Sequence, residues 1–173
     1  TEREAAMANI IIIGGSIMGS SIAYHLAMTG RAGDVCVIEP DPSYEWAAAP
    51  RSSGGVRLMH GLPENIEMSL YGREVYKDFA RLMDVNGLPG GFDFLEHGYL
   101  YLASGAEQVA MAEASWRIQT GLGVPNKLLD RDALAARFSS MNVADIDAAI
   151  HGPQDGFIDP NAGISPQGDQ PRC

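Results

Sequence analysis

The glycine-rich turn GGSIMG at residues 14–19 follows directly on the apolar run IIII at 10–13. A pyrophosphate bound at a helix N-terminus needs backbone N–H groups that no side chain covers, and the positive end of the helix dipole favours it. Gly14 permits the tight turn out of a strand, and Gly19 allows a helix to pack closely on that strand. The predicted phosphate-binding residues of this turn are Gly14, Gly15, Ser16, Met18 and Gly19.

Ser16 stands where the usual pattern has its middle glycine. Its hydroxyl can donate a hydrogen bond or cap the helix N-terminus, whereas its Cβ comes close to the phosphates. We therefore expect the pyrophosphate to bind more weakly or in a slightly displaced position. If the serine is forced to positive φ, the loss of binding free energy should be about 1 kcal/mol.

Glu39 supplies the second chemical signal. It lies 20 residues after Gly19, at the end of the apolar run VCVIE at 35–39. A carboxylate at the end of a second strand can accept both ribose hydroxyls of an adenosine. Because no arginine lies beside it, Glu39 argues against a 2′-phosphate. The turn and Glu39 together predict an adenine-dinucleotide site, and the alternative is a glycine-rich turn in an unrelated α/β domain.

A βαβ unit is needed to bring the turn and Glu39 together. The pattern predicts a buried strand at 9–13, a helix at 17–29 closed by Gly30, and a second buried strand at 35–39. Cys36 lies in that second strand, and we interpret it as a small buried hydrophobe. The overall fold class is therefore α/β, or α+β when the rest of the chain is included.

The chain after Glu39 does not continue as a simple nicotinamide domain, which would soon add another helix and a third parallel strand. Residues 40–63 instead predict a long loop, and long loops in compact domains are usually functional. This order favours a flavoprotein, in which the loop crosses the flavin. The elements predicted next are a helix at 64–85, a strand at 97–104, a helix at 106–120, a short helix at 131–138 capped by Asp130, and a strand at 148–153.

Composition excludes several classes of partner. The net charge is −10 and no basic run exceeds two residues, so nucleic acid and anionic lipid surfaces are disfavoured. The longest apolar run is far shorter than the roughly 20 residues of a membrane span. The leader TEREAA resembles neither a secretory nor a mitochondrial signal, so we expect a cytoplasmic protein. No His, Cys or carboxylate pair has metal-ligand spacing, and we expect no metal site.

Several separated motifs together resemble the amino-terminal part of the D-amino-acid oxidase superfamily of FAD-dependent amine oxidoreductases, especially its sarcosine and dimethylglycine branch. These motifs are IIIGGSIMGSSIAYHL, VIEPD, APRSSGGVRLMHGLPENIEMS, HGYLYLAS and GPQDGFIDPNA. The resemblance implies a Rossmann-like FAD-binding unit with an interleaved substrate domain. It also implies oxidation of a C–N bond in a small secondary or tertiary amine or an amino acid, by hydride transfer to the flavin.

The resemblance also assigns roles to the loop RSSGGVR at 51–57. The backbone of Ser52, Ser53, Gly54 and Gly55 would lie near the isoalloxazine. Arg57 would lie beside flavin and substrate, where a cation stabilises the reduced ring or a carboxylate. His60 is the second catalytic candidate, able to help anchor a carboxylate, and a solvated loop histidine is the alternative. Because residues 47–57 contain neither His nor Cys, we expect non-covalent FAD.

The predicted domains are an FAD-binding unit and flavin loop at 7–63, a helical segment and partial substrate domain at 64–162, and an aberrant or disordered tail at 163–173. The tail GISPQGDQPRC continues no periodic pattern, so we expect an incomplete and inactive fragment. We interpret Asp155 and Asp159 as turn and cap residues. Two other functions stay open: an NAD-dependent Rossmann dehydrogenase domain and a non-catalytic binding or assembly module. Oxygen, a flavoprotein and a quinone all stay open as electron acceptor.

Overall fold

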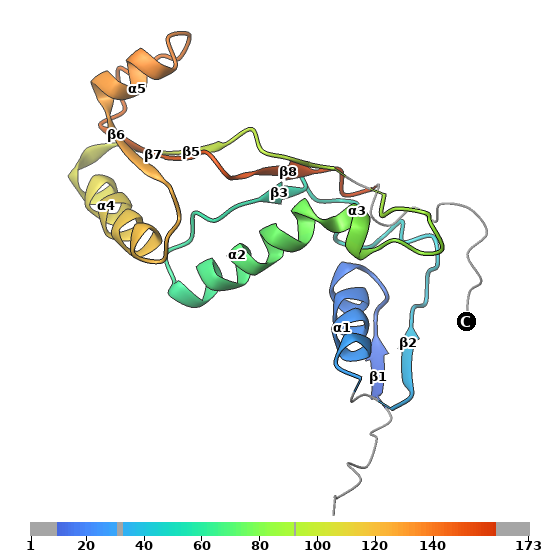
Figure 1. Cartoon of the computed structure of the whole chain (residues 1–173). Helices are drawn as coiled ribbons and strands as arrows, with labels where there is room; N and C mark the ends of the chain where they lie inside the picture. The colour runs from blue at the N-terminus through green and yellow to red at the C-terminus, as the bar shows by residue number, and fades with distance from the viewer. Residues whose placement is uncertain (1–9, 31–32, 92, 162–173) are drawn as a thin grey trace, which may run out of the picture. The chain divides into compact units, whose positions relative to one another are not determined.

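The computed structural model describes residues 10–30, 33–91 and 93–161 (Figure 1). The contacts divide them into two compact units. The first, which we call the glycine-loop unit, extends to Gly54, and the second, the two-sheet unit, comprises Gly55–Asp159. The sequence predicted a domain boundary after residue 63. The short strand β3 (Gly55–Val56) pairs with a strand near residue 157 and so attaches the end of the predicted loop to the two-sheet unit.

The glycine-loop unit is the predicted βαβ unit. It consists of β1 (Ile10–Ile13), α1 (Ile17–Met28) and β2 (Val35–Ile38). The strands are parallel, with Ile10 opposite Val35 and Ile13 opposite Ile38. The helix lies against both strands. The Rossmann-like part of the predicted fold is thus confirmed.

The two strands of this unit are less buried than the sequence predicted. Ile12 is buried, but Ile13 is 87% exposed and Ile11 is 66% exposed. Cys36 on β2 is also exposed, so its interpretation as a buried hydrophobe is wrong for the described chain. The physical reason is that α1 covers one face of the sheet, whereas fully buried parallel strands need cover on both faces.

The two-sheet unit contains two antiparallel three-stranded sheets (Figure 1). One has the order β3-β8-β4, with β4 at Phe94–Leu95 and β8 at Gly156–Ile158. The other has the order β5-β7-β6. Its strands are β5 (Tyr99–Ala103), β7 (Ala148–Gly152) and β6 (Lys127–Asp130). The sequence predicted β5 and β7 but missed β3, β4, β6 and β8, which are too short to alternate clearly.

The helices of this unit are α2 (Pro63–Lys77), α3 (Phe79–Leu82), α4 (Gly105–Gly121) and α5 (Arg131–Arg137). The single helix predicted at 64–85 is interrupted at Asp78, where the backbone leaves helical geometry. The predicted cap of α5 is confirmed, because the side chain of Asp130 accepts a hydrogen bond from Ala133 N at 2.8 Å.

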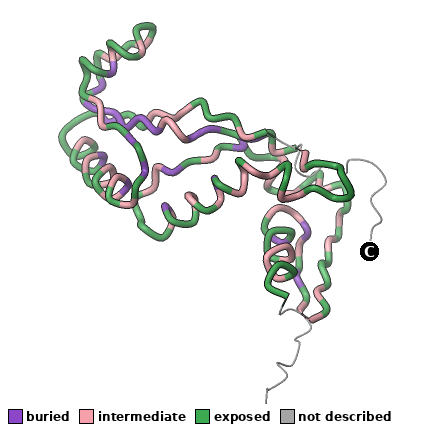
Figure 2. The backbone as a smooth tube through the Cα atoms, viewed as in Figure 1, coloured by how far each residue is buried: buried purple, intermediate pink, exposed green. Residues whose placement is uncertain are grey.

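The core of this unit follows β7, every residue of which is buried (Figure 2). Ala148 and Ile150 pack with Ala103 of β5 and Ala112 of α4. Ala149 packs in a separate cluster with Leu134 of α5. A third cluster consists of Leu58, Ile66 and Val124, and Leu58 directly follows Arg57 in the sequence.

Two further sequence expectations concern the tail and membrane-spanning segments. The predicted tail at 163–173 lies outside the described residues. Among the described helices, none combines the length and apolar character needed to cross a lipid bilayer.

Candidate cofactor-binding site

The glycine turn has the geometry that the sequence predicted. Gly14 has φ +97°, a conformation that favours glycine, and its N–H donates to Ile38 O at 2.8 Å. A Cβ on Gly19 would overlap the carbonyl oxygen of Gly14 and lie 2.9 Å from its carbonyl carbon. The absence of a side chain at Gly19 therefore lets α1 start directly above the end of β1.

Ser16 is the N-cap residue of α1, but its side chain makes no capping hydrogen bond. Its φ is −68° and its ψ is −169°, an extended conformation open to any residue. The expectation that serine is forced to positive φ is therefore wrong. The first turn of α1 contains no acidic side chain, and its first N–H groups lack intrahelical partners, so its N-terminus can receive an anion.

Glu39 links the end of β2 to the glycine turn. Its Oε2 accepts a hydrogen bond from Gly15 N at 2.7 Å, and its Oε1 accepts one from Asp41 N at 3.0 Å. A carboxylate offers about four acceptor positions, so each oxygen keeps one for a ribose hydroxyl. Both backbone bonds also fix the direction of the carboxylate before any ligand arrives.

A pocket of about 410 Å³ opens at this edge of the sheet, within the size range of ligand sites. Its lining comes from Ser16–Met18, from Glu39–Asp41, and from Tyr44 and Trp46–Ala49. The guanidinium of Arg51 lies 5.1 Å from the centre of the Trp46 ring, which holds that wall of the pocket. A helix N-terminus, a carboxylate and aromatic walls fit the adenosine and pyrophosphate of FAD.

The predicted flavin-loop residues fall in both units. Ser52 and Ser53 are exposed, and the Oγ of Ser52 accepts a hydrogen bond from Gly54 N at 3.1 Å. Gly54 is buried with φ +65°, which favours glycine. Gly55 begins β3 and belongs to the two-sheet unit. The cofactor role of these four residues stays a prediction.

The two catalytic candidates lie together in the two-sheet unit. Arg57 is exposed, and its guanidinium carbon lies 5.6 Å from the centre of the Tyr99 ring. His60 is half-buried, and its Nε2 lies 3.0 Å from Arg57 O. A guanidinium that is exposed yet held against an aromatic face can bind a carboxylate with its N–H donors free. Their catalytic roles stay predictions.

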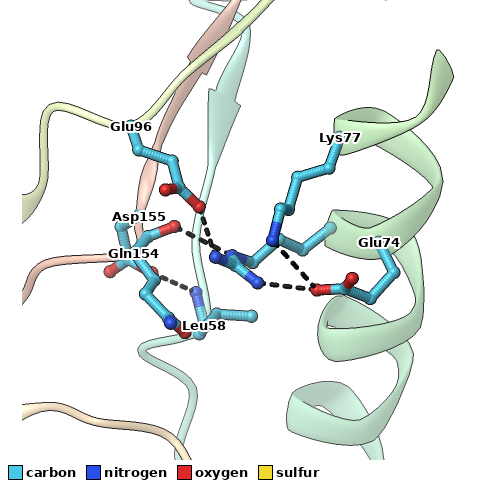
Figure 3. Close-up of polar contacts among 7 residues, drawn as sticks. Leu58, Glu74, Lys77, Glu96, Gln154 and Asp155 are labelled. Carbon is cyan, nitrogen blue, oxygen red and sulfur yellow. Dashed lines mark hydrogen bonds and ion pairs between the residues drawn. The ribbon is translucent and has the colours of Figure 1, made fainter.

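Asp155 is a buried residue of this region whose side-chain contact the sequence did not predict. It is 1% exposed, and its Oδ1 accepts a hydrogen bond from Leu58 N at 2.7 Å (Figure 3). Its backbone closes a turn, as the sequence predicted, because Asp155 N donates to Gly152 O at 3.3 Å, but its side chain has this further, buried contact. No local pattern signals this contact, because the two residues are 97 positions apart.

The charge of Asp155 is disfavoured by its surroundings. Burial raises the pKa of its carboxyl to about 6, although the Leu58 N–H and the nearby His60, Arg57 and Arg73 act in the opposite direction. Arg73 is itself buried and paired with Glu96 and with Glu74, whose Oε1 lies 2.7 Å away. Among the described residues, no cluster of three or more His, Cys, Asp or Glu side chains could hold a metal ion.

Comparison with known proteins identifies a family. A family model described as FAD dependent oxidoreductase, DAO, matches residues 9–163. The chain is 38% identical over 159 residues to the FAD-dependent oxidoreductase domain-containing protein 1 homolog of Drosophila melanogaster, covering 91% of this chain and 30% of that protein. It is 25% identical to human mitochondrial sarcosine dehydrogenase, covering 88% of this chain and 16% of that protein.

A solved structure supports the same assignment. L-proline dehydrogenase from P. horikoshii matches with a TM-score of 0.71 and 27% identity, over 91% of this chain and 40% of that one. The chain thus spans about a third or less of the length of these curated relatives. Since the family model covers nearly all described residues, the chain belongs to the DAO family of FAD-dependent oxidoreductases, with FAD as its cofactor.

Proposed function

We propose that the whole protein uses non-covalently bound FAD to oxidise a C–N bond of a small secondary or tertiary amine or an amino acid. The observation that carries the proposal is the hydrogen bond from Gly15 N to the Glu39 carboxylate. It lies beside the N-terminus of α1, which can bind an anion. In this proposal the glycine-loop unit binds the adenosine and pyrophosphate. The names of the relatives, sarcosine dehydrogenase and L-proline dehydrogenase, support the substrate class.

The chemistry that FAD supplies when bound is acceptance of a hydride from the carbon next to the amine nitrogen. Glu39 would orient the adenosine through its two remaining acceptor positions. Arg57 would bind the carboxylate of an amino-acid substrate, since its guanidinium is exposed and rests on Tyr99. His60, whose ring lies against the Arg57 carbonyl, would assist in anchoring that carboxylate. We propose no electron acceptor.

Nucleotide selectivity tests the role of the glycine-loop unit. We expect the 173-residue chain to bind ADP and FAD in calorimetric titrations, and not FMN, because FMN lacks the adenosine that Glu39 recognises. NADP should bind poorly, because Glu39 repels its 2′-phosphate. Glu39→Gln should weaken ADP binding about tenfold through loss of charge-assisted hydrogen bonds.

The matched control for this titration is Asp41→Asn. Asp41 lines the same pocket, but its carboxylate bonds to Ser43 and only its backbone N–H reaches Glu39. ADP affinity should therefore stay within about threefold of the original value. Equal affinity for FMN and ADP would contradict the assignment of Glu39 to the ribose.

Turnover tests the role of the whole protein. We expect the 173-residue chain with added FAD to show no flavin reduction by sarcosine, dimethylglycine or proline. The reason is that its parallel sheet exposes Ile11 and Ile13 to solvent, so a closed flavin pocket needs further cover. In the whole protein these amines should reduce the flavin, and Arg57→Ala should slow that step on the order of 100-fold while FAD is retained.

Rapid-mixing absorbance measurements separate the two parts of this expectation. Turnover by the 173-residue chain at the rate of a full-length relative would refute its inactivity. An unchanged reduction rate in Arg57→Ala would return Arg57 to the status of a surface cation.

A further inference from the structure

The backbone of the segment Arg57–His60 forms hydrogen bonds with buried polar side chains that come from distant parts of the chain. Leu58 N donates to Asp155 Oδ1 at 2.7 Å, and His60 O accepts from Gln119 Nε2 at 3.0 Å. Asn126 in turn donates from its Nδ2 to Gln119 Oε1 at 2.9 Å. Asp155 and Gln119 are each 1% exposed. Buried side-chain hydrogen bonds thus fix the backbone of the segment at two residues, Leu58 and His60.

The side chain of Leu58 explains why its backbone N–H needs a buried acceptor. It is fully buried with Ile66 and Val124, which draws the adjacent backbone into an apolar cluster. A buried N–H without an acceptor is costly, and β3 ends at Val56, so no strand partner serves Leu58. Asp155 provides the acceptor. Its own backbone is fixed as well, because Asp155 O accepts from Gly98 N at 2.8 Å.

The second oxygen of Asp155 defines the rest of the arrangement. Asp155 Oδ2 and Asn126 Oδ1 are both buried acceptors without a hydrogen-bond partner among the described residues. A Cβ on Gly152 would overlap Asp155 Oδ2 and come within 3.1 Å of Asn126 Oδ1, so both atoms border the space that this glycine leaves open. A proton on Oδ2, or the amide group of an asparagine, is the kind of donor that this pair of acceptors accommodates.

We propose that Asp155 is a positioning residue for the catalytic candidates, which it serves by fixing the backbone of Arg57–His60 and thereby the place of the Arg57 guanidinium on Tyr99. The proposal rests on the proposed function only for what Arg57 then binds. The chain of contacts is continuous: Asp155 Oδ1 holds Leu58 N, Leu58 directly follows Arg57, and the Arg57 guanidinium lies 5.6 Å from the Tyr99 ring centre. Burial favours the protonated form of Asp155 and so supports a donor on Oδ2.

Nuclear magnetic resonance of the 173-residue chain tests the proposal without FAD or an amine. Asp155→Ala should speed hydrogen exchange at the Leu58 amide at least about tenfold, as expected for loss of a bond to a charged or polarised acceptor. The Arg57 side-chain protons should lose the ring-current shift caused by Tyr99, whose size Tyr99→Leu defines. Asp155→Asn keeps an oxygen for Leu58 N and should preserve both signals.

The control is Asp84→Ala. It removes a carboxylate–amide bond, from Gly87 N to Asp84 Oδ1 at 2.9 Å, on an exposed turn that makes none of the hydrogen bonds to residues 57–60 described above. Exchange at Leu58 should then stay unchanged. The amide of Ile150 in β7 reports global unfolding in every variant, because that strand is central and buried.

A pH titration keeps the test decisive if Asp155→Ala does not fold. The Leu58 amide shift of the unmodified chain should follow ionisation of Asp155, and Asp155→Asn should remove that titration. The charged groups that face Asp155 are His60, Arg57 and Arg73, and Asp155→Asn leaves all three in place. A Leu58 amide that does not respond to pH, or an Arg57 shift lost equally in Asp155→Asn, would overturn the proposal. Failure of Arg57→Ala to slow flavin reduction would instead refute the proposed function and leave the positioning result intact.

Discussion

Replacing Gly19 with alanine is expected to disrupt the glycine-loop unit and abolish ADP binding. The added Cβ would overlap the carbonyl oxygen of Gly14 and meet its carbonyl carbon at 2.9 Å. Both are backbone atoms, so no side-chain rotation relieves the overlap, and α1 must move away from β1. Overpacking of this kind costs about 1–3 kcal/mol and sometimes more. The glycine turn would lose its position at the end of β2 in the same movement.

Gly72→Ala is the matched control for Gly19→Ala. Gly72 also lies inside a helix, α2, but the nearest atom to its added Cβ is Tyr76 Cε2 at 3.9 Å, an ordinary contact. Alanine should therefore stabilise α2 by about 0.5–1 kcal/mol through helix propensity. Thermal unfolding by circular dichroism and ADP titration measure both variants. Equal unfolding temperatures and ADP affinities for Gly19→Ala and the unmodified chain would refute the account of close packing.

The second large effect is a loss of stability of the two-sheet unit as pH rises. The folded-state pKa of Asp155 is raised from 3.8 to about 6, so folding favours the protonated carboxyl. The contribution is fully present below pH 3.8 and is lost as pH rises through about 6. The difference between the two values corresponds to roughly 3 kcal/mol between acidic and neutral pH.

Asp155→Asn isolates this effect, because it removes one titrating group and leaves the others in place. The difference in unfolding free energy between Asp155→Asn and the unmodified chain should grow from pH 4 to pH 7 and then level off. Urea unfolding can follow Trp116 of the two-sheet unit in a Trp46→Phe background, since the chain has only these two tryptophans. A difference that is flat from pH 4 to pH 8 would contradict the burial of an ionisable Asp155.

The parts of the site that sequence predicted depend on short spacings. Gly14, Gly19 and Glu39 lie within one βαβ unit, where turn, helix and strand lengths determine which residues meet. The bond from Gly15 N to Glu39 was not predicted. No local sequence pattern indicates it, because it forms only when β1 and β2 pair.

The parts that sequence missed depend on distant contacts. Asp155 and Leu58 are 97 positions apart, and a DG pair ordinarily indicates a turn, so nothing local distinguishes a buried carboxylate here. β8 is only three residues long, and its strand character comes from pairing with both β3 and β4. Cys36 was misjudged for a related reason: an apolar strand predicts burial only where other elements cover it.

The strand order of the two-sheet unit has a consequence for the time course of folding. The central strands of both sheets, β7 and β8, come from one segment at residues 148–158, whereas their partners come from residues 55–130. During synthesis the partner strands therefore leave the ribosome before either three-stranded sheet can be completed, and β5 and β6 are not neighbours because β7 lies between them. Each of these two sheets can form only after β7 and β8 have been synthesised. Their pairing with the earlier strands then closes long loops. Until that moment nascent chains expose unpaired strand edges, the period in which a chaperone would be most useful to them.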